Sequence, residues 1–91
     1  MSEASGEETL LEFPCEYPVI AMGESHSELD SVVVEIIRRH AGDIAEGAVT
    51  SKQSSGGKFT SITVVIEATS KQQLDAIYQD LSGHQAIKYV L

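Results

Sequence analysis

Hydrophobic residues in the first half of the chain change from a continuous run to a helical spacing. A short apolar run over residues 17–23 contains branched side chains and ends in a glycine, which is typical of a buried strand. Apolar positions then recur at i, i+3, i+4, i+7 and i+8 and define one face of a helix: Leu29, Val32, Val33, Ile36 and Ile37, with His40 continuing it at i+11. This spacing predicts a helix that ends at Gly42, because glycine readily adopts the left-handed conformation that stops a helix.

The second half of the chain repeats this alternation of strand and helix. A polar stretch at 46–52 and a strongly hydrophobic stretch at 59–68 flank a turn rich in serine and glycine, which predicts a β-hairpin. The hydrophobic stretch places alternate residues on one face: Ile62, Val64, Ile66 and Ala68. A second one-faced helix follows, carries Leu74, Ile77, Tyr78 and Leu81 and ends at Gly83, and residues 86–91 are expected to form the last strand.

The order β-α-β-β-α-β predicts an α+β protein of the ferredoxin-like class. In this fold a four-stranded antiparallel sheet carries two helices on one face. Right-handed crossovers predict the strand order 4-1-3-2, so the hydrophobic strand 59–68 is central and the polar strand 46–52 is an edge. We expect Ile36 and Ile77, one from each helix, to be buried against the sheet face that carries Val64.

Composition limits the domain count and the classes of partner. A chain of 91 residues makes one domain; we expect residues 1–9 to be a disordered acidic tail and 10–91 the folded unit. The net charge of -8, from fourteen acidic and six basic residues, disfavours binding to nucleic acid phosphates. The sequence has no membrane-spanning apolar run, and its single cysteine, Cys15, cannot form an internal disulfide. We therefore expect a cytoplasmic protein without membrane or nucleic acid partners.

Five short motifs, in their order and spacing, resemble the YbeD-like family of small bacterial proteins over residues 10–91. They are "LLEFP", Met22-Gly23, "RRHAGD" at 38–43, "SIT" at 61–63 and the terminal "VL". The resemblance implies a ferredoxin-like fold similar to the regulatory ACT domains of amino-acid metabolism. It also implies a family whose molecular function is uncharacterised, and it supplies no catalytic residues.

The polar stretch at 21–31 joins the first strand to the first helix. Ser25 and Glu28 fit a capping box, in which the serine accepts a bond from the backbone N–H of Glu28. Ser70 and Gln73, or Thr69 and Gln72, repeat the pattern before the second helix. A second interpretation is that helix N–H groups at this corner bind a small ligand; the candidate ligand-binding residues are Gly23, Ser25, His26 and Ser27.

The sequence disfavours an enzyme, a metal site and a cofactor. Residues 23–27 nearly match the G-x-S-x-G elbow, but a serine replaces the last glycine, so a small hydrolase using Ser25 is a distant third interpretation. The histidines have no local metal-binding spacing; they are His26, His40 and His84. The "SSGGK" stretch at 54–58 lacks the serine or threonine and the helix that a phosphate loop needs. We predict no catalytic residues, no metal and no cofactor.

Two functions remain, and both rest on surfaces. The first is a regulatory or interaction module that forms a homodimer or binds a small ligand, and the alternative is an adaptor that docks another protein. Two helices on one face leave the opposite sheet face and the last strand available for either partner. The candidate interaction residues are Phe59, Thr63, Val65, Lys88 and Tyr89. A monomer whose net charge keeps this edge solvated is equally compatible with the sequence.

Overall fold

A computed structural model describes residues 12–25 and 28–91. The expected tail at 1–9 and the candidate residues His26 and Ser27 lie outside the described residues. The elements, in chain order, are β1 (Cys15–Glu24), α2 (Leu29–Ala41), the 3-10 helix η1 (Glu46–Ala48), β2 (Val49–Gln53), β3 (Phe59–Ala68), α3 (Lys71–Ser82) and β4 (Tyr89–Val90).

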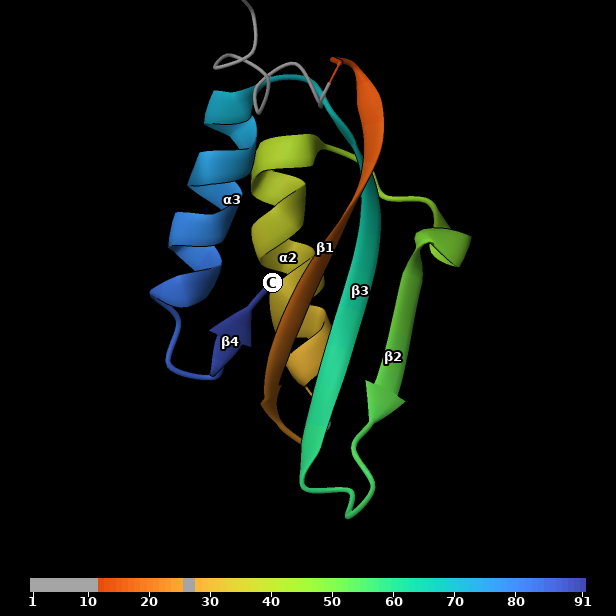
Figure 1. Ribbon diagram of the computed structural model, residues 1–91, viewed down its shortest axis with the longest axis vertical. Coiled ribbons are helices and arrows are strands. Elements are labelled where there is room, and N and C mark those ends of the chain that lie inside the picture. The colour runs from red at the N-terminus through yellow and green to blue at the C-terminus, as the bar shows by residue number, and fades with distance from the viewer. Residues whose placement is uncertain (1–11, 26–27) are drawn as a thin grey trace, which may run out of the picture.

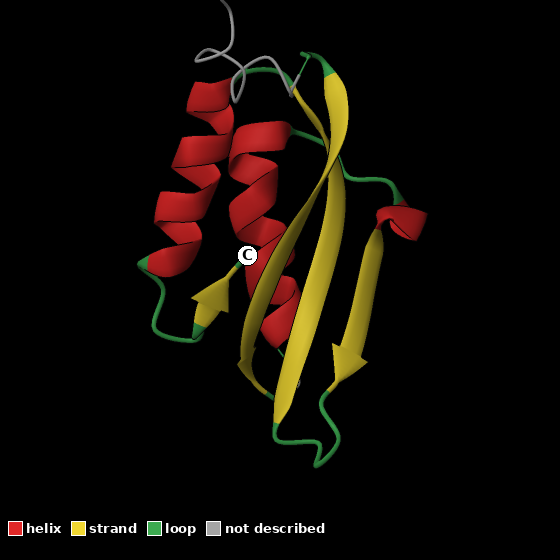
Figure 2. Cartoon of the chain, in the orientation of Figure 1, coloured by secondary structure: helices red, strands yellow, loops and turns green. Residues whose placement is uncertain are grey.

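The four strands form one antiparallel sheet in the order β2-β3-β1-β4, which confirms the predicted topology. Both helices lie on the same side of this sheet, and β2 stands at the edge away from them (Figure 1). Figure 2 shows the resulting two layers, with α2 and α3 on one side of the sheet and the short helix η1 beside the start of β2. The fold is the ferredoxin-like α+β fold, and in the described part of the chain no helix packs on the second sheet face.

The core lies between the two helices and the inner face of β1 and β3. Val19 pairs with Val64 and Ala21 with Ile62, and all four side chains are at most 1% exposed. These residues share a face because side chains opposite each other in an antiparallel pair point the same way. The helices contribute the expected isoleucines: Ile77 of α3 is fully buried and Ile36 of α2 is 4% exposed. Their predicted burial is confirmed.

Helix α3 begins at the capping residue that the sequence suggests. The Ser70 hydroxyl accepts a bond from the backbone N–H of Gln73, at 3.0 Å. The Gln73 amide oxygen in turn accepts a bond from the backbone N–H of Thr69, at 2.8 Å. The bond to Gln73 confirms the Ser70 cap. Gly42 ends α2 with a φ of 79°, and its N–H donates to the carbonyl of Arg38.

Three elements begin three residues later than predicted. Helix α2 begins at Leu29 with Glu28 as its N-cap residue, so the expected capping role of Ser25 is wrong. The last strand covers only Tyr89–Val90, because the backbone of Ile87 is held in a turn by a bond from its N–H to the carbonyl of His84. The first part of the polar edge strand is the helix η1, so β2 begins at Val49.

Polar contacts join the helices and the chain ends that pack beside them. His40 of α2 and Asp80 of α3 form a side-chain contact of 2.5 Å, and the Gln73 amide donates to the carbonyl of His40. The Tyr78 hydroxyl donates to Tyr17 of β1 at 3.1 Å. Burial, and then the bond to Tyr17, raises the pKa of Tyr78 well above its usual range.

Candidate functional site

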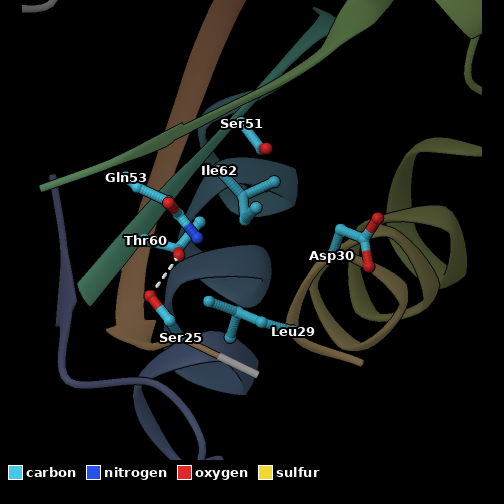
Figure 3. A pocket seen from close by; sticks show the side chains of 7 residues that line it. All are labelled: Ser25, Leu29, Asp30, Ser51, Gln53, Thr60 and Ile62. Atoms are coloured by element: carbon cyan, nitrogen blue, oxygen red, sulfur yellow. Dashed lines mark hydrogen bonds between the residues drawn. The ribbon is translucent and has the colours of Figure 1, made fainter. Parts of the chain in front are cut away.

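A groove of about 520 Å³ lies on the helix side of the sheet, where β2 extends beyond the helices (Figure 3). Its lining combines an apolar floor with polar walls from three elements and a corner: Ser25, Leu29, Asp30, Ser51, Gln53, Thr60 and Ile62. Leu29 and Ile62 form the floor, and each is 1% exposed. Figure 3 shows Asp30 of α2 across the groove from Ser51 and Gln53 of β2. We call this feature the corner groove.

The register of the sheet explains why β2 contributes to the corner groove. Ser51 pairs with Ile62 and Gln53 pairs with Thr60, so these four side chains lie on the helix side of the sheet. Four of the five β2 residues are exposed. The part of the inner sheet face that belongs to β2 is therefore left open as the wall of a groove.

The Ser25 side chain contacts β3. Its hydroxyl oxygen lies 2.6 Å from that of Thr60, and its backbone N–H donates to the carbonyl of Lys58 at 2.9 Å. A serine nucleophile needs a base within hydrogen-bonding distance, and among residues 12–25 and 28–91 the hydroxyl of Ser25 contacts another hydroxyl. The geometry provides hydrogen-bonding groups for a ligand, and it does not support the hydrolase interpretation.

Gly23 lies at the same corner, but it packs against the last loop. A Cβ atom at this position would lie 2.2 Å from the carbonyl oxygen of Ala86 and 3.2 Å from Leu29. The residue is buried, so it is not available to contact a ligand. Of the four predicted ligand-binding residues, the structure brings only Ser25 into the groove, since His26 and Ser27 lie outside the described residues.

The other residues that the sequence suggests for metal or phosphate binding do not come together at one site. No group of three His, Cys, Asp or Glu side chains that could hold a metal ion occurs in residues 12–25 and 28–91. His40 contacts Asp80, and the ring of His84 accepts a bond from the backbone N–H of Ala86. The "SSGGK" stretch is the loop between β2 and β3, where Gly57 has a φ of 73°. Within the described chain, no helix is long and apolar enough to span a membrane.

The outer side of the sheet forms a second candidate surface, which we call the open face. Side chains alternate between the two faces along β3. Phe59, Thr63 and Val65 therefore point to the face opposite that of the buried Ile62 and Val64. Tyr89 of β4 pairs with Met22 of β1, so the two share this face. The exposed fractions are 65% for Tyr89 and 37% for Val65.

Apolar side chains follow one another across the open face. Pro18 pairs with Val65, and Met22 pairs with Tyr89; Ile20 lies between Pro18 and Met22 on β1. The neighbouring Leu91 is 70% exposed, and its N–H donates to the carbonyl of Ile20. We call Pro18, Ile20, Met22, Val65 and Tyr89 the apolar row.

The sequence analysis identified only part of this surface. Lys88 lies at its edge, where the amine is 3.7 Å from the carboxylate of Glu24. Ile20 and Met22 are not predicted to lie on this surface, because a continuous apolar run indicates a strand that is buried on both faces. Side chains alternate along the first strand, and that strand is predicted to pair with the last one. Together these two patterns place Ile20 and Met22 on the same face as Tyr89.

The fold and these two surfaces define a small α+β protein of the ferredoxin-like class. The solution structure of protein HP0495 from H. pylori is similar, with a TM-score of 0.72 over 89% of this chain and 85% of that chain. The two sequences are 18% identical, so this similarity concerns the fold alone.

Sequence comparison identifies the family. The chain belongs to the family described as "Protein of unknown function (DUF493)", whose model matches residues 8–91. A UPF0250 protein of Chromobacterium violaceum is 50% identical over 82 residues, which cover 90% of this chain and 92% of that protein. A UPF0250 protein of Neisseria gonorrhoeae is 38% identical over the full length of both. The resemblance to the YbeD-like family is thereby confirmed, and these relatives carry no named activity.

Replacing Gly23 with alanine tests its packing role. The added methyl group meets a backbone carbonyl, which a side-chain rotation cannot relieve, so we expect Gly23→Ala to lower the free energy of unfolding by about 1–3 kcal/mol. Gly47 is the matched control, because a Cβ there has no neighbouring atom within 4 Å; Gly47→Ala should change stability by less than about 0.5 kcal/mol. Urea denaturation measures both, and equal effects would contradict this assignment.

Proposed function

We propose that this protein is a non-enzymatic interaction module that binds another protein through the open face of its sheet. The observation that carries the proposal is the apolar row, which both helices leave uncovered because they pack on the opposite side. Contiguous exposed apolar surface on a small soluble domain marks interaction sites. Tyr89 suits such a surface, because aromatic residues concentrate at the centres of protein interfaces.

Two kinds of partner fit this surface, a second copy of the chain and a different protein. The edge of β4 offers little to a second copy, because the strand is only two residues long. The net charge of -8 also opposes self-association. These features favour a different protein as the partner, with the side chains of the open face as the contact.

Photo-crosslinking in the cell tests this proposal. A benzophenone amino acid at position 89 should form covalent adducts, whereas the same residue at the exposed Gln72 position of α3 should not. An adduct with twice the mass of the chain would identify a homodimer, and any other mass would identify a different protein. The absence of adducts at position 89 above the level at position 72 would contradict docking through the open face.

The corner groove supports a second candidate, a regulatory module that binds a small molecule. Its walls offer the hydroxyl groups of Ser25, Ser51 and Thr60 and the amide of Gln53 above an apolar floor. Asp30 adds one carboxylate, which disfavours anions and favours neutral or amine-bearing molecules. This lining suits a small polar metabolite with an apolar part.

A thermal-shift screen of free amino acids and other small metabolites tests this candidate. A compound that binds the folded chain raises its melting temperature by mass action. Ser51→Leu fills the groove and should abolish the shift, whereas Thr50→Leu, in the same strand on the opposite face, should retain it. Failure of every compound, or an equal shift in both variants, would exclude a small-molecule role for this groove.

A further inference from the structure

The free edge of β2 exposes the backbone groups of three residues. The Ser54 N–H donates to the carbonyl of Phe59 at 2.8 Å, and bonded pairs alternate along an antiparallel ladder. The register therefore makes Thr50 and Lys52 the residues that bond to β3. The N–H and C=O groups of Val49, Ser51 and Gln53 consequently point away from β3, toward the outer edge.

Within the described chain, β2 is the end of the sheet and pairs only with β3. Proteins usually protect such an edge by proline, by bulges, by several charges or by a covering element. Here the strand has no proline, its register with β3 is continuous, and Lys52 is its only charge. The backbone of β2 is therefore ready to pair with another extended segment.

The corner groove lies directly beside this edge. Ser51 and Gln53, whose backbones point outward, also direct their side chains into the groove. A strand added to β2 would place every second side chain on the same face, next to the groove. Asp30 faces that position from α2, and the residues that line the groove include no basic side chain.

We propose that β2 accepts an extended segment of a partner protein as a fifth strand, with a lysine or arginine of that segment directed toward Asp30. Backbone bonds supply affinity in this recognition mode, and the groove supplies specificity through one side chain. A second copy fits less well, because the groove-side residues of its β2 are Val49, Ser51 and Gln53, which carry no cation. This surface is separate from the open face, so the proposal does not depend on docking there.

A library of random 12-residue peptides displayed on phage provides the probe. Peptides selected on the full chain, then synthesised, should be enriched in lysine or arginine. Their affinity should fall at least tenfold in Ser51→Pro, because proline removes an outward N–H while the bonds to β3 remain. Thr50→Ala, whose side chain lies on the opposite face of the same strand, should bind as the wild type does.

Removing the charge of Asp30 tests the contact with the lysine of the peptide independently of Ser51→Pro. Asp30→Asn should weaken binding of the lysine-containing peptide about tenfold, and replacing that lysine with norleucine should cost no further affinity in this variant.

The proposal is overturned if no peptide binds above background, if Asp30→Asn has no effect, or if a correctly folded Ser51→Pro binds equally well. Loss of binding in Tyr89→Lys alone would also overturn it, because the peptide would then occupy the open face. Concentration-dependent dimerisation that Ser51→Pro abolishes would assign the edge to a second copy instead.

Discussion

The antiparallel pairing of β1 with β3 is the constraint on which the rest of the structure depends. Every residue of β1 from Cys15 to Glu24 has a partner in β3, so the two strands form a continuous ten-residue ladder. A slip of one residue would exchange the two faces of either strand. The burial of Val19, Ala21 and Val64 fixes the register. The same register fixes Ile20 and Met22 on the open face, so one ladder determines both the core and the proposed docking surface.

A second constraint on the structure is that the two helices cover only part of the inner face of the four-stranded sheet. The helices pack over the inner face of the central strands, and β2 extends beyond them as an exposed edge. The corner groove follows from this difference in area, whereas the free backbone edge follows from the position of β2 at the end of the sheet and the outer face is uncovered because α2 and α3 both pack on the other side. A domain of this size therefore presents three distinct surfaces: the corner groove, the free edge of β2 and the open face.

The comparison of Ser25 with Ser70 shows what the sequence predicts and where it fails. Both serines begin a similar four-residue pattern, and periodicity correctly predicted the helix that follows each. Ser70 is the cap of α3, whereas the Ser25 hydroxyl contacts Thr60 of β3 and its helix begins only at Leu29. A local pattern contains no information about a partner from a distant strand. The packing of Gly23 is not predictable from the local pattern for the same reason, since its close neighbour Ala86 belongs to the last loop.

The candidate surfaces were predictable to different degrees. The alternation of strand 59–68 correctly placed Thr63 and Val65 on the face without helices. The corner groove was not predicted beyond Ser25, because its other walls come from β2, β3 and α2 and meet only in the folded chain. The length of the last strand was overestimated, since hydrophobicity alone does not show the turn in which the Ile87 N–H donates to the backbone carbonyl of His84.

Hydroxyl-radical footprinting in living cells, compared with the purified chain, tests most directly whether the open face is a docking surface. The account predicts that oxidation of Met22 and Tyr89 falls several-fold in cells, because a bound partner excludes solvent from the apolar row. Phe13, which is 36% exposed and precedes β1, should be oxidised equally in both samples. Equal oxidation of Met22 and Tyr89 in cells and in the purified chain would contradict the account.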